Sequence, residues 1–380
     1  MNILQYSEEH NEFRARLQSF LEKEVIPFVD EWEKDKIIPR DIWRKMGKAG
    51  FLCPLVPKEY GGIGGDFLHS AIVSEELAKT NHCGLSASLH SDIIVPYILS
   101  YGTEEQKQKY IPGCVSGDIV TAVAMTEPSA GSDLASMVTV AVEDGDNIVI
   151  SGSKTFISNG IYSDLVILAA KDEGIDDPHR AISLYLVEKD TPGFKKGKKL
   201  DKMGFYSQDT SELFFSNCVI PKTNRLGEKG MGFLMLMSKL QQERLVVTMG
   251  AIFGSEFALN WTIDYCKKNF EGRKPISKYQ ANQFTLVELM TQVKIGKVFV
   301  EKLISEHMEG KNVVVETSMA KYWTTDLLKN LTDKCLDLIG DFATLEKCPI
   351  ARGFRDARVM PIFAGTNEIM KSIAAKFMGL

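Results

Sequence analysis

A glutamate stands in the middle of an apolar stretch in the second half of the chain. Glu243 belongs to the segment Leu240-Gln-Gln-Glu-Arg-Leu245, which Met, Leu and Val residues flank on both sides. Glu243 and Arg244 are adjacent on the helix that this pattern predicts, so their side chains point in different directions and do not simply neutralise each other. Burying an unpaired carboxylate is costly. Glu243 is therefore either a functional base or an ordinary residue on the exposed edge of a helix.

Three further segments combine small, hydroxyl-bearing and amide residues, and the first of them leaves backbone N–H groups and hydroxyls free to approach a flat polar ligand. They are residues 123–133, 154–160 and 361–370. In the first, Thr126 and Ser132 lie in a turn that ends a predicted strand, and in the second, Phe156 lies beside hydroxyl and amide groups. In the third, a loop leads into a final helix with Thr366 as its N-cap and Glu368 in its first turn. Taken alone, the first two carry little weight, because a structural turn explains them more simply.

The composition and charge of the chain restrict the classes of protein to which it can belong. With 44% hydrophobic and 25% charged residues, the chain has the composition of a globular protein and not of a disordered one. The formal net charge of −5 argues against a nucleic-acid partner. No apolar run approaches the ~18 residues of a membrane span, and the N-terminus lacks the pattern of a secretory signal. We therefore expect a protein with no membrane attachment, located in the cytoplasm.

Recognisable motifs for metal binding and for nucleophilic catalysis are absent from the sequence. The six histidines do not fall at metal-ligand spacing, and neither an HExxH nor a GxSxG motif occurs. The seven cysteines are odd in number, scattered and free of any CxxC pair, which indicates reduced thiols. Neither a metal centre nor a disulfide framework is expected.

Hydrophobic periodicity divides the chain into three regions, and we expect an α+β fold. Residues 1–118 are predicted to be helical, with helix starts at Ser7 and Thr103. Residues 119–226 hold short β-branched and aromatic runs without a helix-length segment between them, which predicts an antiparallel sandwich or barrel. Residues 227–380 predict a bundle of four helices. The expected strands are 119–125, 148–150, 165–169, 182–187 and 213–215, and the expected bundle helices are 233–268, 279–308, 314–339 and 366–378.

Taken together and in this order, the motifs resemble those of the acyl-CoA dehydrogenase family. The resemblance extends over nearly the whole chain and is strongest to the long-chain and isovaleryl branches. The matching motifs are AMTEPSAGSD at 124–133, SGSKTFISNG at 151–160, KMGFYSQDTSELFF at 202–215, QQERL at 241–245 and AGTNEIM at 364–370. The resemblance implies the acyl-CoA dehydrogenase fold, with an N-terminal helical domain, a middle β domain and a C-terminal helical bundle. It also implies FAD as the cofactor and a homotetramer that holds FAD at subunit contacts.

The resemblance further implies an oxidation between the α and β carbons of an acyl thioester. In the family, a carboxylate removes the α proton, flavin N5 takes the β hydrogen as hydride, and hydrogen bonds to the thioester oxygen stabilise the developing enolate. Most branches carry the catalytic glutamate on the loop before the last helix, where this chain has Ala364. The long-chain and isovaleryl branches carry it on the first bundle helix, at the position of Glu243. The resemblance therefore implies that Glu243 is the base.

The resemblance also implies roles for other residues, position by position. The residues implied to bind the substrate are Ser132, Gln241, Arg244, Ala364 and Gly365. The residues implied to bind FAD are Val123, Met125, Thr126, Ser132, Phe156, Ser158, Arg273, Gln280, Thr366 and Glu368. Phe156 and Ser158 would cover the flavin face and its N5 side, and the amide of Ala364 or Gly365 would bind the thioester oxygen.

The chain departs from the family pattern where the ADP half of FAD is held. Asn269 stands where the family has an arginine, and Arg273 is the cation that would supply the charge from a shifted position. The family's Gln-x-x-Gly-Gly segment ends here in Asp341, and an acidic residue is unfavourable near a pyrophosphate. Gln280 does match a family FAD contact. The motifs thus support the isoalloxazine half of the site more fully than the ADP half.

Several functions stay open at the level of sequence. The acyl carrier is either coenzyme A or the phosphopantetheine of a carrier protein, as in relatives that oxidise prolyl or acyl groups. The electron acceptor is either an electron-transferring flavoprotein or oxygen. A flavin monooxygenase on the same fold is disfavoured by Glu243, because such relatives commonly lack the catalytic glutamate. Asn269 and Asp341 suggest a further alternative, a paralogue that has lost FAD and serves as a scaffold.

Overall fold

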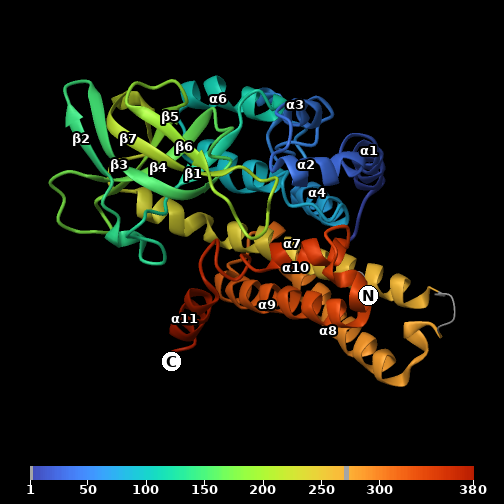
Figure 1. Ribbon diagram of the computed structural model, residues 1–380. Coiled ribbons are helices and arrows are strands. Elements are labelled where there is room, and N and C mark those ends of the chain that lie inside the picture. The colour runs from blue at the N-terminus through green and yellow to red at the C-terminus, as the bar shows by residue number, and fades with distance from the viewer. Residues whose placement is uncertain (1–2, 269–273) are drawn as a thin grey trace.

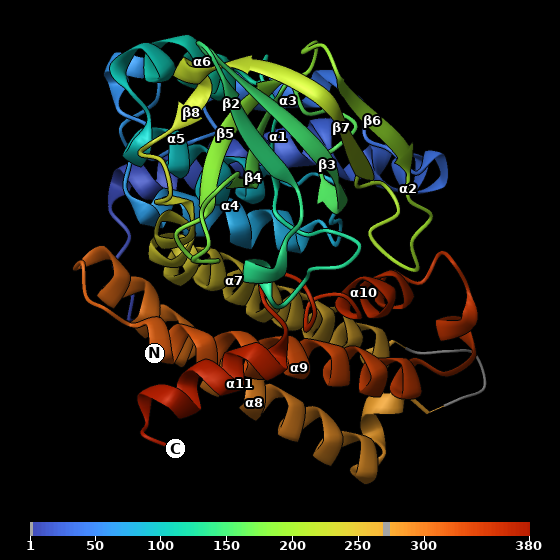
Figure 2. The same ribbon diagram turned by 90° about the vertical axis from the view of Figure 1, so that its left-hand side faces the viewer.

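Three groups of elements follow one another along the chain and pack into two tiers. A computed structural model describes residues 3–268 and 274–380. In Figure 1 the early helices and the sheet lie side by side in the upper tier, and the long C-terminal helices run beneath both. The quarter-turned view in Figure 2 shows the same two tiers. The site residues expected from the sequence come from both tiers. A site that combines them would lie at the boundary between the two tiers.

The first region is helical, as the sequence predicts. Ser7 and Thr103 are both N-caps with complete capping boxes, in which each side chain accepts from the backbone N–H three residues on. A π-helical turn, Leu89–Ile94, leads directly into the helix that follows it. The helices are α1 (Glu8–Glu24), α2 (Val29–Asp35), α3 (Asp41–Lys48), α4 (Phe67–Lys79), α5 (Val95–Tyr101) and α6 (Glu104–Ser116).

The second region is a single eight-stranded sheet. The strands are β1 (Thr121–Ala124), β2 (Val140–Asp144), β3 (Asn147–Ser158), β4 (Leu165–Asp172), β5 (Ile182–Glu188), β6 (Phe194–Lys199), β7 (Thr210–Pro221) and β8 (Arg225–Leu226). They run in the order β6-β7-β3-β2-β4-β5-β8, with β1 paired to β4. All five expected strands occur. β2, β6 and β8 were not expected, and β6 is mostly lysine.

The prediction of an antiparallel sheet is wrong in part, because the sheet is mixed. β1 pairs with β4 in parallel, and the beginning of β2 pairs in parallel with the end of β4, while the remaining pairs are antiparallel. A parallel pair needs a connection that carries the chain back along the strand direction. Here the β2–β3 hairpin lies between β1 and β4 in the sequence and serves as that connection in place of a helix. The absence of helix-length segments therefore did not exclude parallel pairing.

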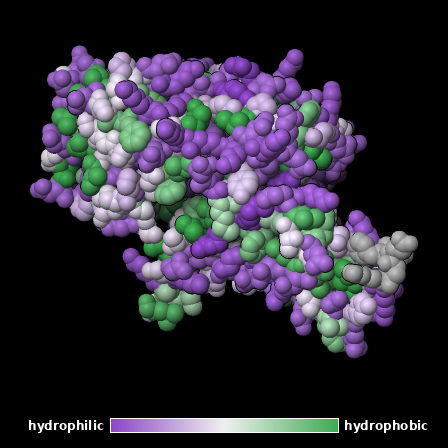
Figure 3. Space-filling view, viewed as in Figure 1, coloured by the Kyte–Doolittle hydropathy of each residue, from purple (hydrophilic) through white to green (hydrophobic). Residues whose placement is uncertain are grey.

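The third region is a group of helices that begins with the longest one, a helix of 36 residues. The helices are α7 (Gly232–Lys267), α8 (Gln280–Met308), α9 (Val314–Ile339), α10 (Pro349–Ala357) and α11 (Asn367–Phe377). α9 packs against α7, α10 and α11. The four expected helices correspond to α7, α8, α9 and α11, and each begins and ends within one residue of its predicted bounds. The short helix α10 was not expected. The apolar residues Phe377, Met378 and Leu380 stay exposed at the end of α11, at the lower left of Figure 3. Within the described ranges, no helix combines the length and hydropathy that crossing a membrane requires.

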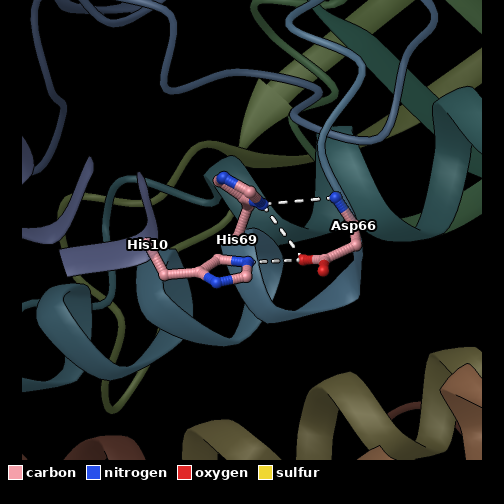
Figure 4. A group of neighbouring side chains, drawn as sticks. All are labelled: His10, Asp66 and His69. Atoms are coloured by element: carbon pink, nitrogen blue, oxygen red, sulfur yellow. Dashed lines mark hydrogen bonds and ion pairs between the residues drawn. The ribbon is translucent and has the colours of Figure 1, made fainter. Parts of the chain in front are cut away.

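Two helix starts are joined by a cluster of two histidines and an aspartate, which Figure 4 shows converging. Asp66 caps α4 by accepting from Leu68 N (3.0 Å), and its Oδ1 also lies 2.9 Å from His10 Nε2 and 3.1 Å from His69 Nδ1. His10 Nδ1 accepts from Ser7 N (3.1 Å), and His69 Nδ1 accepts from Asp66 N (3.2 Å). Because these nitrogens are all engaged by protein atoms, the cluster is explained as two linked capping boxes rather than as a metal centre.

Asp66→Ala removes the cap of α4 and the link to α1 together. We expect the free energy of unfolding to fall by about 1–2 kcal/mol, the upper part of the range for a lost N-cap, measured by denaturant unfolding. Asp66→Asn keeps an oxygen for the cap and should lose less. Equal losses in the two variants, or a midpoint that shifts with added zinc or EDTA, would contradict the assignment as a cap.

Candidate active site

Glu243 is buried on α7 and is bonded to a tyrosine from the first region. Only 5% of Glu243 is exposed, and the hydroxyl of Tyr97 on α5 donates to Glu243 Oε1 at 2.6 Å. Burial raises the pKa of Glu243, and the Tyr97 hydrogen bond opposes that rise in part. The exposed-edge interpretation of Glu243 is therefore excluded. The residue is a desolvated carboxylate, the kind of group that can accept a proton from a weak carbon acid.

The side chains of Arg244 and Gln241, which flank Glu243 on α7, point away from its carboxylate. For Arg244 this agrees with the prediction from its adjacent position. Arg244 is buried and donates to Ser318 Oγ on α9 (3.1 Å), while its Nε has no hydrogen-bond partner in the structure. Gln241 accepts from Val313 N (2.8 Å) and donates to Lys311 O (3.1 Å), so it ties α7 to the α8–α9 connection. The structure thus does not bring the side chain of Gln241 together with Glu243.

The loop before α11 is held in an unusual backbone conformation by a buried lysine. Ala364 (φ 51°) and Gly365 (φ 86°) are both left-handed, which is uncommon for alanine. The Nζ of Lys321 on α9 donates to Gly365 O (2.7 Å) and to Asn367 Oδ1 (3.1 Å). Burial lowers the pKa of Lys321 to about 8. Lys321 therefore fixes the peptide group between Gly365 and Thr366, which directly follows the backbone amides of Ala364 and Gly365.

The same loop packs directly on α7. Phe363 and Ala364 lie against a small buried cluster, which consists of Val247, Ala251, Leu328, Ala357 and Met360. Val247 is four residues beyond Glu243, so it lies one turn further along the same face of α7. The loop and the carboxylate are thus neighbours along one side of that helix. A small residue at 364 suits this packing.

The residues expected at the flavin ring share one accessible face of the sheet. On β1 and just beyond, Val123 and Met125 alternate with buried alanines, and on β3, Phe156 and Ser158 alternate with buried residues. Thr155 N donates to Thr126 O (2.9 Å), which joins the two segments. Phe156 stands at a register shift, with φ 57° and 69% of its surface exposed. An exposed aromatic in a strained conformation is typical of a ligand-binding position.

A buried ion pair fixes the turn that follows β1. The Nζ of Lys154 on β3 donates to Glu127 Oε1 (2.8 Å) and to Met125 O (3.0 Å), and both side chains of the pair are fully buried. Glu127 also accepts from Val138 N (2.6 Å) and Thr139 N (3.0 Å). Both residues lie inside the motifs at 124–133 and 151–160. The pair therefore holds Met125 and Thr126 in place beside Phe156.

These features fit the isoalloxazine half of FAD. The accessible face offers a flat aromatic surface at Phe156, with hydroxyl groups nearby at Thr126 and Ser158, and Ser132 is exposed on the loop between β1 and β2. Thr366 caps α11 by accepting from Ile369 N (3.3 Å), and Glu368 lies in its first turn. In Figures 1 and 2 the loop between β1 and β2 descends from the sheet towards the helices below.

The residues expected at the ADP half lie far from this face within one chain. Gln280 begins α8 at the opposite end of the molecule from the sheet (Figure 1). Arg273 and Asn269 fall outside the described residues. Asp341 is exposed in the short helical turn after α9. The structure therefore does not bring Gln280 together with Phe156 in the same chain.

The motif at 202–215 joins all three regions beside the site. Phe205 N donates to Asp356 Oδ1 on α10 (2.5 Å), and the Phe205 ring meets the Phe363 ring edge-on with centroids 6.2 Å apart. On the other side, Ser207 Oγ lies 2.7 Å from His82 Nε2 of the first region. Burial raises the pKa of Asp356 to about 7. This motif therefore positions the loop before α11 against the sheet.

Comparison with known proteins agrees with this geometry. Family models described as the N-terminal, middle and C-terminal domains of acyl-CoA dehydrogenases match residues 7–118, 122–218 and 230–379. A flavoprotein oxidoreductase acting on a CH–CH bond is thus the class that fold and sequence define. The chain belongs to the acyl-CoA dehydrogenase family.

Three relatives show how broad the similarity is. The mitochondrial long-chain specific acyl-CoA dehydrogenase of Rattus norvegicus is 42% identical over 372 residues, which cover 98% of this chain and 86% of the relative. The crystal structure of an acyl-CoA dehydrogenase from Geobacillus kaustophilus has a TM-score of 0.97 at 50% identity and covers 99% of each chain. The prolyl acyl carrier protein oxidase AnaB has a TM-score of 0.90 at 29% identity, covering 99% of this chain and 100% of its own.

The sequence did not single out four of the residues that shape this site. Tyr97 lies in an apolar run, and nothing local shows that its hydroxyl meets a carboxylate 146 positions away. Glu127 and Lys154 lie within quoted motifs, but their pairing depends on the register of β3. Lys321 lies in a predicted bundle helix. A charged residue inside an otherwise buried strand or helix face was the available signal for both lysines.

Lys154→Met leaves Glu127 buried without its cation. We expect the free energy of unfolding to fall by about 3–5 kcal/mol, as for a buried ion pair that loses one partner, and bound flavin to be released more readily. Thermal melts and the flavin absorbance of the purified protein measure the two effects. The double variant Glu127→Gln/Lys154→Met removes both charges and should recover part of the stability. If it is no more stable than the single variant, the charge is not what holds the turn.

Proposed function

We propose that the protein is an FAD-dependent dehydrogenase of acyl thioesters, with Glu243 as its catalytic base. The observation that carries the proposal is the buried Glu243 carboxylate on α7, one helical turn from the point where the Ala364 loop packs. The substrate loses a proton from the α carbon and a hydride from the β carbon and gains a double bond between them. When bound, FAD accepts the hydride.

The chain's own residues supply the acid–base part of this reaction. Glu243 takes the α proton, and its raised pKa makes it a stronger base than an exposed carboxylate. The backbone amide of Ala364 or Gly365, in a loop that Lys321 holds, donates to the thioester oxygen and stabilises the developing enolate. Figure 3 shows an apolar hollow between the two tiers, on the side where α7 begins, which suits exclusion of water during the reaction.

The cofactor would be held mainly by the accessible face of the sheet. Phe156 would cover the flavin ring, Thr126 and Ser158 would hydrogen-bond to its polar edge, and Val123, Met125 and Ser132 would complete that side. Thr366 and Glu368 would meet the phosphate and ribityl part at the start of α11. The fit of these residues to a flat aromatic group supports FAD, and the family membership supports it independently.

The preferred acyl carrier is coenzyme A, because the long-chain relative acts on acyl-CoA. The similarity to a prolyl acyl carrier protein oxidase motivates a second candidate, an acyl group held on a carrier protein and oxidised with oxygen. Anaerobic bleaching of the flavin by matched acyl-CoA and acyl-carrier thioesters separates the two. Reoxidation by electron-transferring flavoprotein or by oxygen then identifies the acceptor.

Glu243→Gln should keep bound flavin and thioester affinity but lose reduction of the flavin by substrate by about 10³-fold, because the base is removed. Stopped-flow absorbance under anaerobic conditions measures this step. Glu256→Gln is the matched control, since Glu256 lies on the same helix and pairs with Lys297 on α8 (2.8 Å), away from the loop. Unimpaired bleaching in Glu243→Gln would place the base elsewhere. Purification of the wild-type protein without flavin would favour the scaffold alternative.

We also propose that copies of the chain assemble into a homotetramer, so that Gln280 of one chain approaches the FAD of another. The remoteness of Gln280 from Phe156 within one chain motivates this, and α8 leaves Phe284, Val287 and Ile295 exposed. Apolar side chains exposed in this density on one helix are typical of an interface.

A charge on the exposed face of α8 should break this assembly. We expect Val287→Glu to reduce the mass of the particle in light scattering and to lower its flavin content. Gln292→Glu adds the same charge at another exposed position of α8 and should change neither. A wild-type protein that is monomeric yet retains flavin fully would contradict the proposal.

A further inference from the structure

Tyr97 belongs to the upper tier, whereas Glu243, which it contacts, belongs to α7 in the lower tier. It lies on α5, directly after the π-helical turn Leu89–Ile94, and it is completely buried. π-Helical turns are rare in proteins, and those that occur are often found at functional sites. The side chain crosses from the first region to α7, where its hydroxyl donates to Glu243 Oε1 at 2.6 Å. This length is within the range of charge-assisted O–H···O⁻ bonds.

The hydrogen bond has two consequences for the carboxylate. It occupies Oε1 and so restricts the terminal torsion angle of Glu243, which has a broad distribution in an unbonded glutamate. Oε2 is then left as the oxygen that takes a proton. It also stabilises the ionised form against the cost of burial. A base that must be ionised while desolvated is helped by such a donor, because burial favours the protonated form and the hydrogen bond favours the ionised one.

The other charged and titratable groups around Glu243 have partners of their own. On α7, Arg244 is turned towards Ser318, and Lys239 donates to Ser100 Oγ (2.6 Å). On α5, Tyr101 is bonded to Ser238. On α8, His307 lies 3.1 Å from Gln241 Nε2. On the π-helical turn, Asp92 accepts from Ser70 Oγ (2.6 Å). In the part of the chain that the structure describes, Tyr97 is the group recorded in direct contact with the carboxylate.

We infer that Tyr97 is a positioning residue for the reaction, which fixes the rotation of the Glu243 carboxylate and keeps it ionised in its buried site. The inference rests on the proposed role of Glu243 as the base. Tyr97 acts through Glu243 and needs no contact with the substrate. A purely structural role, in which the bond only ties α5 to α7, would change stability without changing how Glu243 titrates.

Tyr97→Phe removes the hydroxyl and keeps the ring. Without the donor the pKa of Glu243 rises, so the acid limb of the pH profile of kcat/KM should move to higher pH by about one to two units. At pH values below the shifted limb, flavin reduction should slow roughly tenfold or more, and it should recover as the pH is raised. Flavin content and thioester affinity should stay near wild type.

Tyr101→Phe is the matched control, because Tyr101 lies one turn along α5 and its hydroxyl meets Ser238 instead of Glu243. Its acid limb should coincide with that of the wild type. Incorporation of 3-fluorotyrosine at position 97 is a second test that preserves shape. The more acidic phenol donates more strongly, so the acid limb should move to lower pH.

The outcomes separate this inference from the proposed function. If Glu243→Gln still reduces flavin, the proposed base is wrong. If Glu243→Gln is inactive but the acid limb of Tyr97→Phe is unmoved, Glu243 stands and the inference about Tyr97 is overturned. A loss in Tyr97→Phe that is equal at every pH, with a lower melting temperature, would show a structural role alone. Opposite shifts of the limb in the two Tyr97 variants would support the inference.

Discussion

The central physical constraint in this protein is the cost of keeping a carboxylate away from water. Glu243 is buried on α7, and the phenol of Tyr97 on α5 donates to it. Burial makes the carboxylate a stronger base, but it also favours the protonated form that cannot act as one. The hydrogen bond from Tyr97 works against that second effect. The proposed chemistry therefore depends on a balance between desolvation and one donor that arrives from a different region of the chain.

Other buried charges perform a related task, which is to fix segments that have no regular structure. Lys154 and Glu127 hold the turn after β1, Lys321 holds the loop before α11, and Asp356 accepts from the backbone of Phe205. Each of these groups binds backbone atoms as well as, or instead of, another charge. Removing any one leaves a buried polar group unsatisfied, which is costly. The site is thus shaped by contacts between buried charged groups and backbone atoms as well as by the helices and strands.

The sequence predicted the helices well because their signals are local. Capping boxes at Ser7 and Thr103 marked the starts of α1 and α6, and sustained apolar stripes predicted the bounds of α7, α8, α9 and α11 nearly to the residue. The sheet was less predictable, since β6 owes its place to pairing with β7 and the parallel β1–β4 pair depends on a hairpin that lies elsewhere in the sequence. Family motifs located Glu243 and the Phe156 face. They did not reveal Tyr97 or Lys321, because those contacts join positions far apart in the chain and no periodicity encodes them.

The position of Glu243 on a long helix separates two duties that a single loop would otherwise combine. In the proposed mechanism, the loop at Ala364 has only to present backbone N–H groups, which any side chain can accompany, while the proposed base is carried by the 36-residue helix α7. Changes in the loop can then alter its packing against α7 without moving the proposed base. Such a division lets substrate range drift through evolution while the proton-transfer step stays constant.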